Sequence, residues 1–204
     1  MRKKKQILFI GDSVTAGHRS WLFPSGFGYV KMISSQLTSE FQVINRGING
    51  DRLIDVERRS SRDFLNKNPE FISIDIGIND VWRRFDSSSP TSDFQFLVSY
   101  EKVINQTTKI LLNSKIILCE PFFLPHLREH DKWVEDLLGK ISVIHFLAKK
   151  YSLPVVPFNS HLNGLTEELS WRALAKDGIH PTRLASNVMA ELWLSTFMEN
   201  QIEH

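Results

Sequence analysis

Hydrophobic and polar positions along the chain alternate between short apolar runs and longer segments of mixed character. Several of the short runs are apolar at consecutive positions, which is typical of strands covered by helices on both faces. Five runs have the length and residue types of β-strands: residues 6–11, 41–47, 70–77, 115–121 and 153–158. We therefore expect a buried parallel sheet.

Helix-length segments separate these runs. Pro90 and Ser92 precede one of them, and Pro181 opens the last, where proline fits the first helical turn. The alternation predicts an α/β fold, a three-layer α/β/α sandwich around a parallel sheet of about five strands. The 204 residues contain no long linker, so we expect a single domain over residues 1–204. The predicted helices cover residues 27–38, 51–66, 93–112, 130–151 and 182–201.

The charge balance narrows the classes of partner. The chain has 25 basic and 23 acidic residues, a net charge of +2, which is too small a surplus to predict nucleic acid as a partner. Apolar runs stay well short of the roughly 18 residues that span a membrane. The basic start, residues 1–5, is followed only by a strand-length apolar run. We therefore expect no secretory signal peptide and a cytoplasmic location.

A single cysteine, Cys119, excludes an intramolecular disulfide and a metal cluster built from cysteines. It lies in the apolar run "KIILCEPFF", where a buried structural thiol is favoured over a nucleophile. The chain also lacks G-x-G-x-x-G and Walker-type motifs, which argues against a nucleotide-binding domain.

Polar residues follow the predicted strands. In doubly wound sheets the functional crevice lies at the carboxyl ends of the strands. The polar segments supply a hydroxyl, a carboxamide, a carboxylate, an imidazole and exposed glycine backbone, which are the groups that a serine hydrolase uses. These segments are Gly11-Asp12-Ser13, Asn45 to Asp51, Gly77 to Asp80 and Asp177 to Pro181.

Each segment also has a purely structural interpretation. Ser13 could be a helix N-cap, and Asp177 could belong to an ordinary turn. Asn79 could bond its own backbone, and Gly50 could serve a turn with positive φ. The coincidence of all four at strand ends favours catalysis. A non-catalytic binding module remains the rival from another class.

The four segments, in this order, resemble the sequence blocks of the SGNH (GDSL-type) hydrolase family: "GDSVTAG", "NRGINGD", "GIND" and "DGIHP". The resemblance implies an α/β/α fold and a catalytic triad. It assigns the nucleophile to Ser13, the base to His180 and the acid to Asp177. It places the oxyanion hole at the backbone N–H groups of Ser13 and Gly50 and at the side chain of Asn79.

Three further stretches are similar to a subgroup that contains acetylxylan esterases and related carbohydrate acetylesterases: "GINDVWRRFD", "ILCEPFFLP" and "FGYVKMISSQL". This similarity implies hydrolysis of small acyl esters, O-acetyl groups on xylan or xylo-oligosaccharides, through an acyl-enzyme. The alternative is a lysophospholipase, thioesterase or arylesterase of the same family. Neither needs a metal or an organic cofactor.

Contacts to the substrate are less defined by the sequence. Trp82 and Arg83 follow the third strand, and Trp171 precedes Asp177. Aromatic rings stack on sugars, so these three residues are candidate substrate contacts, with core packing as the alternative. Asp12 and Asp80 each have two possible roles, as a structural acid or as a substrate contact. The structural role is favoured for Asp12. The expected partner is a small-molecule or oligosaccharide ester. Exposed aromatic residues could also form the interface of a homo-oligomer.

Overall fold

A computed structural model describes residues 4–202 of the chain. Its centre is a sheet of five parallel strands in the order β2-β1-β3-β4-β5. The predicted parallel α/β sheet is confirmed. The strands are β1 (Lys5–Gly11), β2 (Phe41–Gly47), β3 (Phe71–Asp75), β4 (Lys115–Cys119) and β5 (Val155–Val156).

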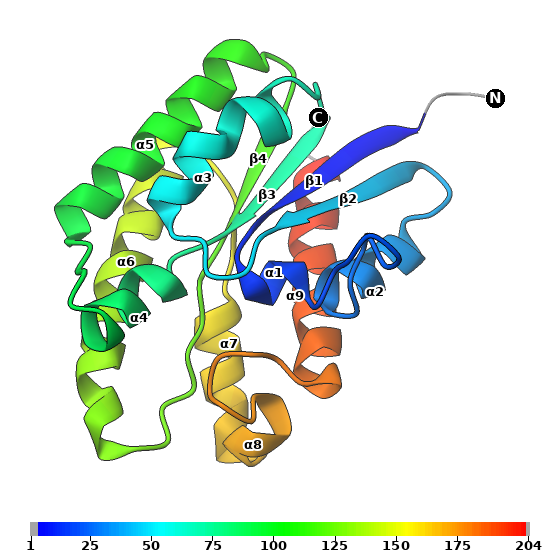
Figure 1. Cartoon of the computed structure of the whole chain (residues 1–204). Helices are drawn as coiled ribbons and strands as arrows, with labels where there is room; N and C mark the ends of the chain where they lie inside the picture. The colour runs from blue at the N-terminus through cyan, green and yellow to red at the C-terminus, as the bar shows by residue number, and fades with distance from the viewer. Residues whose placement is uncertain (1–3, 203–204) are drawn as a thin grey trace.

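Helices cover both faces of this sheet (Figure 1). On one face lie α1 (Ser13–Ala16), α2 (Tyr29–Gln36) and α9 (Arg183–Ile202), joined by α7 (Phe158–Gly164). The other face is covered by α3 (Leu53–Ser60), α5 (Asp93–Ile110) and α6 (Asp131–Tyr151). The remaining helical elements are α4 (Ile78–Asp86), α8 (Trp171–Leu174), a π-helix (Ser61–Leu65) and two 3-10 turns (Arg128–His130 and Leu165–Glu167). Within residues 4–202 the helices are too short or too polar to span a bilayer.

The consecutive apolar positions of β1 divide between two cores. Ile7 and Phe9 point into the core beneath α2 and α9, while Leu8 and Ile10 point into the core beneath α3 and α5. This follows from the two-residue period of a strand. In the first core Trp193 packs against Phe9, with 4.8 Å between ring centroids. Because β1 is buried on both faces, its apolar residues follow one another without interruption in the sequence.

At the carboxyl edge of the sheet, the last residues of four neighbouring strands pair with one another in a single row. Gly11 pairs with Gly47 on one side and with Asp75 on the other, and Asp75 pairs with Cys119. A Cβ on Gly11 would lie 2.3 Å from the Asp75 carbonyl oxygen, and one on Gly47 would lie 2.3 Å from the Ala16 nitrogen. These two glycines let α1 fold directly back onto the strand ends.

Several predicted element boundaries were wrong. The expected strand 70–77 ends at Asp75, because Gly77 adopts φ 139° and is the N-cap of α4. The expected helix 51–66 is α-helical only from Leu53 to Ser60 and continues as the π-helix. The last strand is only two residues long, and Phe158 already begins α7. The helices α1, α7 and α8 were missed, since each is shorter than the periodicity can register. The longer α4 was missed because its first residues, in the segment Gly77 to Asp80, were interpreted as a turn after the third strand.

Replacing Gly47 by alanine is expected to lower the free energy of unfolding by about 2 kcal/mol, because the new methyl group meets the backbone of α1 rather than a movable side chain. Urea denaturation measures the effect. Gly164→Ala is the matched control, since a Cβ at Gly164 meets no atom within 4 Å. Equal urea midpoints for the two variants would contradict the prediction and show that the backbone of α1 shifts to accommodate a methyl group at position 47.

Candidate active site

The turn after β1 presents Ser13 at the start of α1. Asp12, not Ser13, is the N-cap of this helix, and its Oδ1 accepts a hydrogen bond of 2.9 Å from the Val14 N–H. The helix ends after one turn at Gly17, which adopts the left-handed conformation. Because Asp12 performs the capping, the hydroxyl of Ser13 is free for other contacts.

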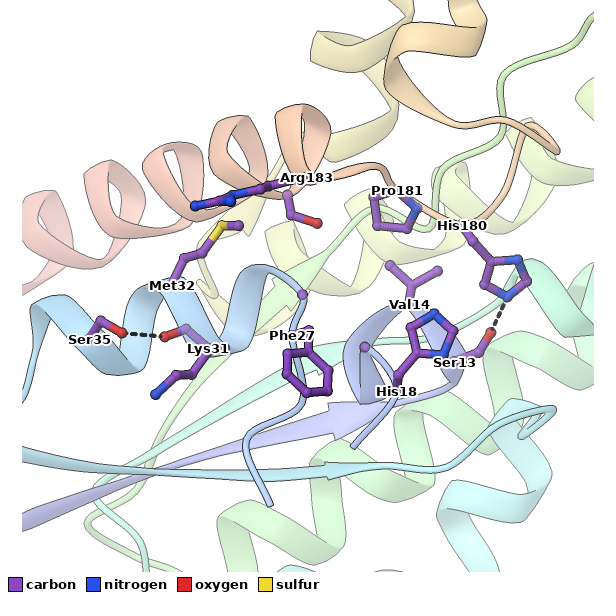
Figure 2. Close-up of a pocket in the computed structure, with 13 residues that line it drawn as sticks. Ser13, Val14, His18, Phe27, Lys31, Met32, Ser35, His180, Pro181 and Arg183 are labelled. Carbon is purple, nitrogen blue, oxygen red and sulfur yellow. Dashed lines mark hydrogen bonds between the residues drawn. The ribbon is translucent and has the colours of Figure 1, made fainter. Parts of the chain in front are cut away.

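Ser13, His180 and Asp177 form a continuous chain of hydrogen bonds. Ser13 Oγ lies 2.9 Å from His180 Nε2 (Figure 2). On the other side of the ring, His180 Nδ1 lies 2.6 Å from Asp177 Oδ2. The fold thus brings together side chains from the two ends of the sequence. An arrangement of hydroxyl, imidazole and carboxylate in this order can activate the hydroxyl for nucleophilic attack.

Asp177 is fixed by its own loop. Its Oδ1 accepts hydrogen bonds from the N–H groups of Ile179 at 3.0 Å and His180 at 2.8 Å. Burial alone would raise the pKa of Asp177, but the hydrogen bonds from the His180 ring and from these two N–H groups outweigh it and hold the pKa below its ordinary value. Asp177 is therefore a carboxylate that orients the imidazole.

Gly50 and Asn79 lie in the loops after β2 and β3. Gly50 adopts φ 80°, and within residues 4–202 no acceptor is bound to its N–H or to that of Ser13. Asn79 is buried, and its Nδ2 donates one hydrogen bond of 3.0 Å to the Asp51 carbonyl. The second Nδ2 hydrogen is left for another acceptor. These groups can serve as oxyanion donors.

Arg59 of α3 connects the loops that carry these groups. Its side chain is only 7% exposed. It donates to the Gly11 carbonyl at 3.1 Å and to the Arg46 carbonyl at 3.0 Å. It also pairs with Asp51 at 2.6 Å and with Asp63 at 2.7 Å. One side chain thereby ties the end of β1, the end of β2 and the loop next to Gly50.

Buried acids lie beneath Ser13. Asp75, which was not singled out from the sequence, accepts hydrogen bonds from the Tyr29 hydroxyl at 3.3 Å and from Thr15 Oγ1 at 3.4 Å. Burial raises its pKa to about 7, against the opposing effect of these two hydrogen bonds. Burial and the nearby Asp75 also raise the pKa of Asp12 well above its usual range.

Asp80 has a structural contact as well. It is fully buried, and its Oδ2 accepts a hydrogen bond of 3.0 Å from the Leu53 N–H, which ties α4 to α3. Burial raises its pKa to about 6. Asp12 and Asp80 thus both act as structural acids that bind loop or helix N–H groups.

The three candidate substrate contacts, Trp82, Arg83 and Trp171, lie outside the pocket at Ser13 and His180. Trp82 packs against Trp133 with 6.0 Å between ring centroids, and Arg83 pairs with Asp86. Trp171 stacks on the His126 ring at 3.9 Å. The pocket that contains Ser13 and His180 is not lined by Trp82, Arg83 or Trp171. Their role in binding stays a prediction.

The pocket at Ser13 and His180 has a volume of about 500 Å³ and lies between α1, α2 and the start of α9 (Figure 2). Sequence reasoning missed several of its residues, because no motif marks them. The only sequence feature that could have indicated a wall of this pocket is the pair Gly17-His18, which directly follows α1. His18 adopts φ 59°, a left-handed conformation uncommon for a residue with a side chain. Other missed residues on its walls include Lys31, Met32 and Arg183.

Metal binding has no evident site in the described part of the chain. Residues 4–202 contain no group of three or more His, Cys, Asp or Glu side chains arranged to hold a metal ion. Cys119 is fully buried and unbridged, and burial raises the pKa of its thiol well above the usual range. The prediction of a buried structural thiol is confirmed.

Comparison with known proteins extends over almost the whole chain. A sequence model of the GDSL-like Lipase/Acylhydrolase family matches residues 9–186. An acetylxylan esterase of Geobacillus stearothermophilus is 29% identical over 204 residues, which cover 93% of this chain and 92% of that protein.

Solved structures agree with the fold. The structure of a GDSL-like protein from Parabacteroides merdae ATCC 43184 is 27% identical, with a TM-score of 0.90 and 96% of each chain covered. A catalytic mutant of Axe2, an acetylxylan esterase from Geobacillus stearothermophilus, is 25% identical, with a TM-score of 0.86 and 96% of each chain covered.

Asp75 makes stability depend on pH. Its pKa is raised from 3.8 to about 7, so between these values the folded protein holds a proton that the unfolded chain releases. The contribution of Asp75 to the free energy of unfolding therefore falls as the pH rises through this window. Asp75→Asn is expected to gain stability relative to wild type on going from about pH 5 to about pH 8. Thermal melting across this range measures it, with the exposed Glu40→Gln as control. Parallel pH curves for wild type and Asp75→Asn would contradict the prediction.

Proposed function

The chain belongs to the GDSL-like Lipase/Acylhydrolase family, and we propose that it is a serine esterase that removes small acyl groups, chiefly acetyl, from carbohydrates. The family membership and the acetylxylan esterase relative make it a carboxylic ester hydrolase. The observation that carries the proposal is the hydrogen-bonded chain from Ser13 Oγ through His180 to Asp177.

In the proposed acylation step, His180 Nε2 accepts the proton of the Ser13 hydroxyl as Oγ attacks the ester carbonyl carbon. Asp177 holds the proton on Nδ1 and stabilises the imidazolium that forms. The carbonyl oxygen becomes an oxyanion that accepts hydrogen bonds from the N–H groups of Ser13 and Gly50 and from Asn79 Nδ2. The tetrahedral intermediate then collapses, and His180 gives its proton to the departing alcohol.

Deacylation repeats these roles with water as the nucleophile. His180 Nε2 removes a proton from a water molecule that attacks the acyl carbon bound to Ser13. The same three donors stabilise the second oxyanion, and His180 returns the proton to Ser13 Oγ as the acid is released. Each step moves protons only between Ser13, His180, water and the substrate, so the reaction uses no cofactor.

Support for carbohydrate acetyl esters as substrates comes from the relatives. The curated relative and several similar structures bear the names acetylxylan esterase or acetyl-xylooligosaccharide esterase. We extend this substrate class, O-acetyl groups on xylan or xylo-oligosaccharides, to this chain. A lysophospholipase, thioesterase or arylesterase would use the same triad. Trp82, Arg83 and Trp171 remain proposed contacts for the sugar, and we propose one domain over residues 1–204.

Replacing Ser13 by alanine is expected to lower the hydrolysis of p-nitrophenyl acetate by at least a thousandfold, because the nucleophile is lost while the fold is kept. Initial rates measure the loss, and mass spectrometry after fluorophosphonate treatment should find the label on Ser13. Ser142→Ala, on the exposed face of α6, is the matched control. Equal rates for wild type and Ser13→Ala would contradict the proposal that Ser13 is the nucleophile.

A series of p-nitrophenyl esters from acetate to palmitate is expected to give the highest kcat/KM at acetate. A parallel screen should release acetate from acetylated xylo-oligosaccharides faster than fatty acid from lysophospholipid. A preference for acyl chains of about eight carbons or more would favour the lipase-like alternative, since each buried CH₂ of a matching pocket adds roughly 0.8 kcal/mol.

A further inference from the structure

The pocket that begins at Ser13 and His180 has an unbalanced charge. Its lining includes His18, Lys31 and Arg183 and contains no aspartate or glutamate. Figure 2 shows Lys31 on α2 and Arg183 at the start of α9, on opposite walls, with Met32 between them. A pocket lined by charges of one sign concentrates ligands of the opposite sign.

Neither cation is neutralised by the protein. Lys31 and Arg183 form no ion pair with any carboxylate of residues 4–202, and both side chains are exposed. Two other surface cations, by comparison, are neutralised: Arg84 pairs with Asp136 at 3.0 Å and Lys150 pairs with Glu101 at 2.5 Å. The two pocket cations are thus available to a ligand.

The position of the pocket indicates which part of the ester it holds. His180 must reach the oxygen of the leaving alcohol in order to protonate it, so the alcohol lies on the His180 side of the carbonyl carbon. His180 and Ser13 line the pocket, whereas Gly50 and Asn79 do not. An acetyl group is far smaller than the 500 Å³ of the pocket. The space therefore suits the alcohol.

We propose that the alcohol portion of the substrate carries an anionic group, a carboxylate or a phosphate, that binds at the end of the pocket lined by Lys31 and Arg183. This inference rests on the proposed esterase function and narrows its substrate class to acetyl esters of acidic sugars. The apolar groups of Val14 and Met32 contact the sugar, and the cations bind the anion at the far end of the pocket.

Matched substrates test the proposal. Monoacetylated methyl glucuronoside and methyl glucoside differ only in the carboxylate, and monoacetylated glucose 6-phosphate supplies a phosphate. Two exposed cations are expected to raise kcat/KM for one of the anionic substrates about tenfold over the glucoside. The preference should shrink in about 1 M NaCl, because salt screens exposed charges. The stronger anionic substrate identifies the source of the charge.

The double variant Lys31→Glu/Arg183→Glu is expected to reverse the ratio of the two kcat/KM values in favour of the glucoside. Lys109→Glu/Lys132→Glu, with two exposed lysines on α5 and α6, is the matched control and should keep the wild-type ratio. Thermal melting establishes that both variants fold. An unchanged ratio in Lys31→Glu/Arg183→Glu would overturn the proposal.

Two other outcomes also decide against it. Equal kcat/KM for neutral and anionic sugars would overturn the proposal while leaving the esterase function intact. A preference for mono-p-nitrophenyl succinate over p-nitrophenyl acetate would place the anion on the acyl group and overturn the assignment to the alcohol. Failure to hydrolyse p-nitrophenyl acetate at all would instead count against the esterase function.

Discussion

The guanidinium of Arg59 lies beneath the active-site loops and bonds to the backbone at the ends of β1 and β2. A buried cation is costly unless it is paired, and here Asp51 and Asp63 provide both charge and hydrogen bonds. Lysine cannot replace it, because only the planar guanidinium reaches four acceptors at once. Together with the backbone hydrogen bond from the Ile48 N–H to the Gly11 carbonyl, this side chain fixes the strand ends from which the loops of Ser13 and Gly50 begin.

The acids beneath Ser13 present a second electrostatic constraint. Asp12 and Asp75 are both buried; burial raises the pKa of each, and the nearby Asp75 raises the pKa of Asp12 further. A negative charge there would oppose the oxyanion that forms above it, so a proton on Asp75 favours the reaction electrostatically. The hydrogen bonds from Thr15 and Tyr29 keep Asp75 in place in either protonation state. The local polar network thus ties α1 and α2 to the end of β3.

Sequence patterns predicted the parts of the structure that depend on periodicity and on turn chemistry. The sheet, its parallel strands and the long helices follow from apolar runs such as that of β1. Ser13 was found because it directly follows a strand of a parallel sheet. Asp177 and His180, which lie in the loop between α8 and α9, were found because their segment resembles a sequence block of the SGNH family. Arg59 and Asp75 were not found, since a buried charge in a helix or strand resembles any other polar residue until its partners are known. The pocket cations were missed for a related reason: Lys31 and Arg183 lie on separate helices, and only the packing of α2 beside α9 makes them neighbours.

The glycines at the end of β1 and β2 have a consequence for how this protein can change. Gly11 and Gly47 leave no room for a side chain, so the nucleophile turn can hardly vary without disturbing the backbone around it. The far end of the pocket, in contrast, is lined by the exposed side chains of Lys31 on α2 and Arg183 on α9. Substitutions there change what enters the pocket and leave the hydrogen-bonded chain at Ser13 untouched. Selection, natural or in the laboratory, can therefore retune the substrate on two helices while the reaction centre stays fixed.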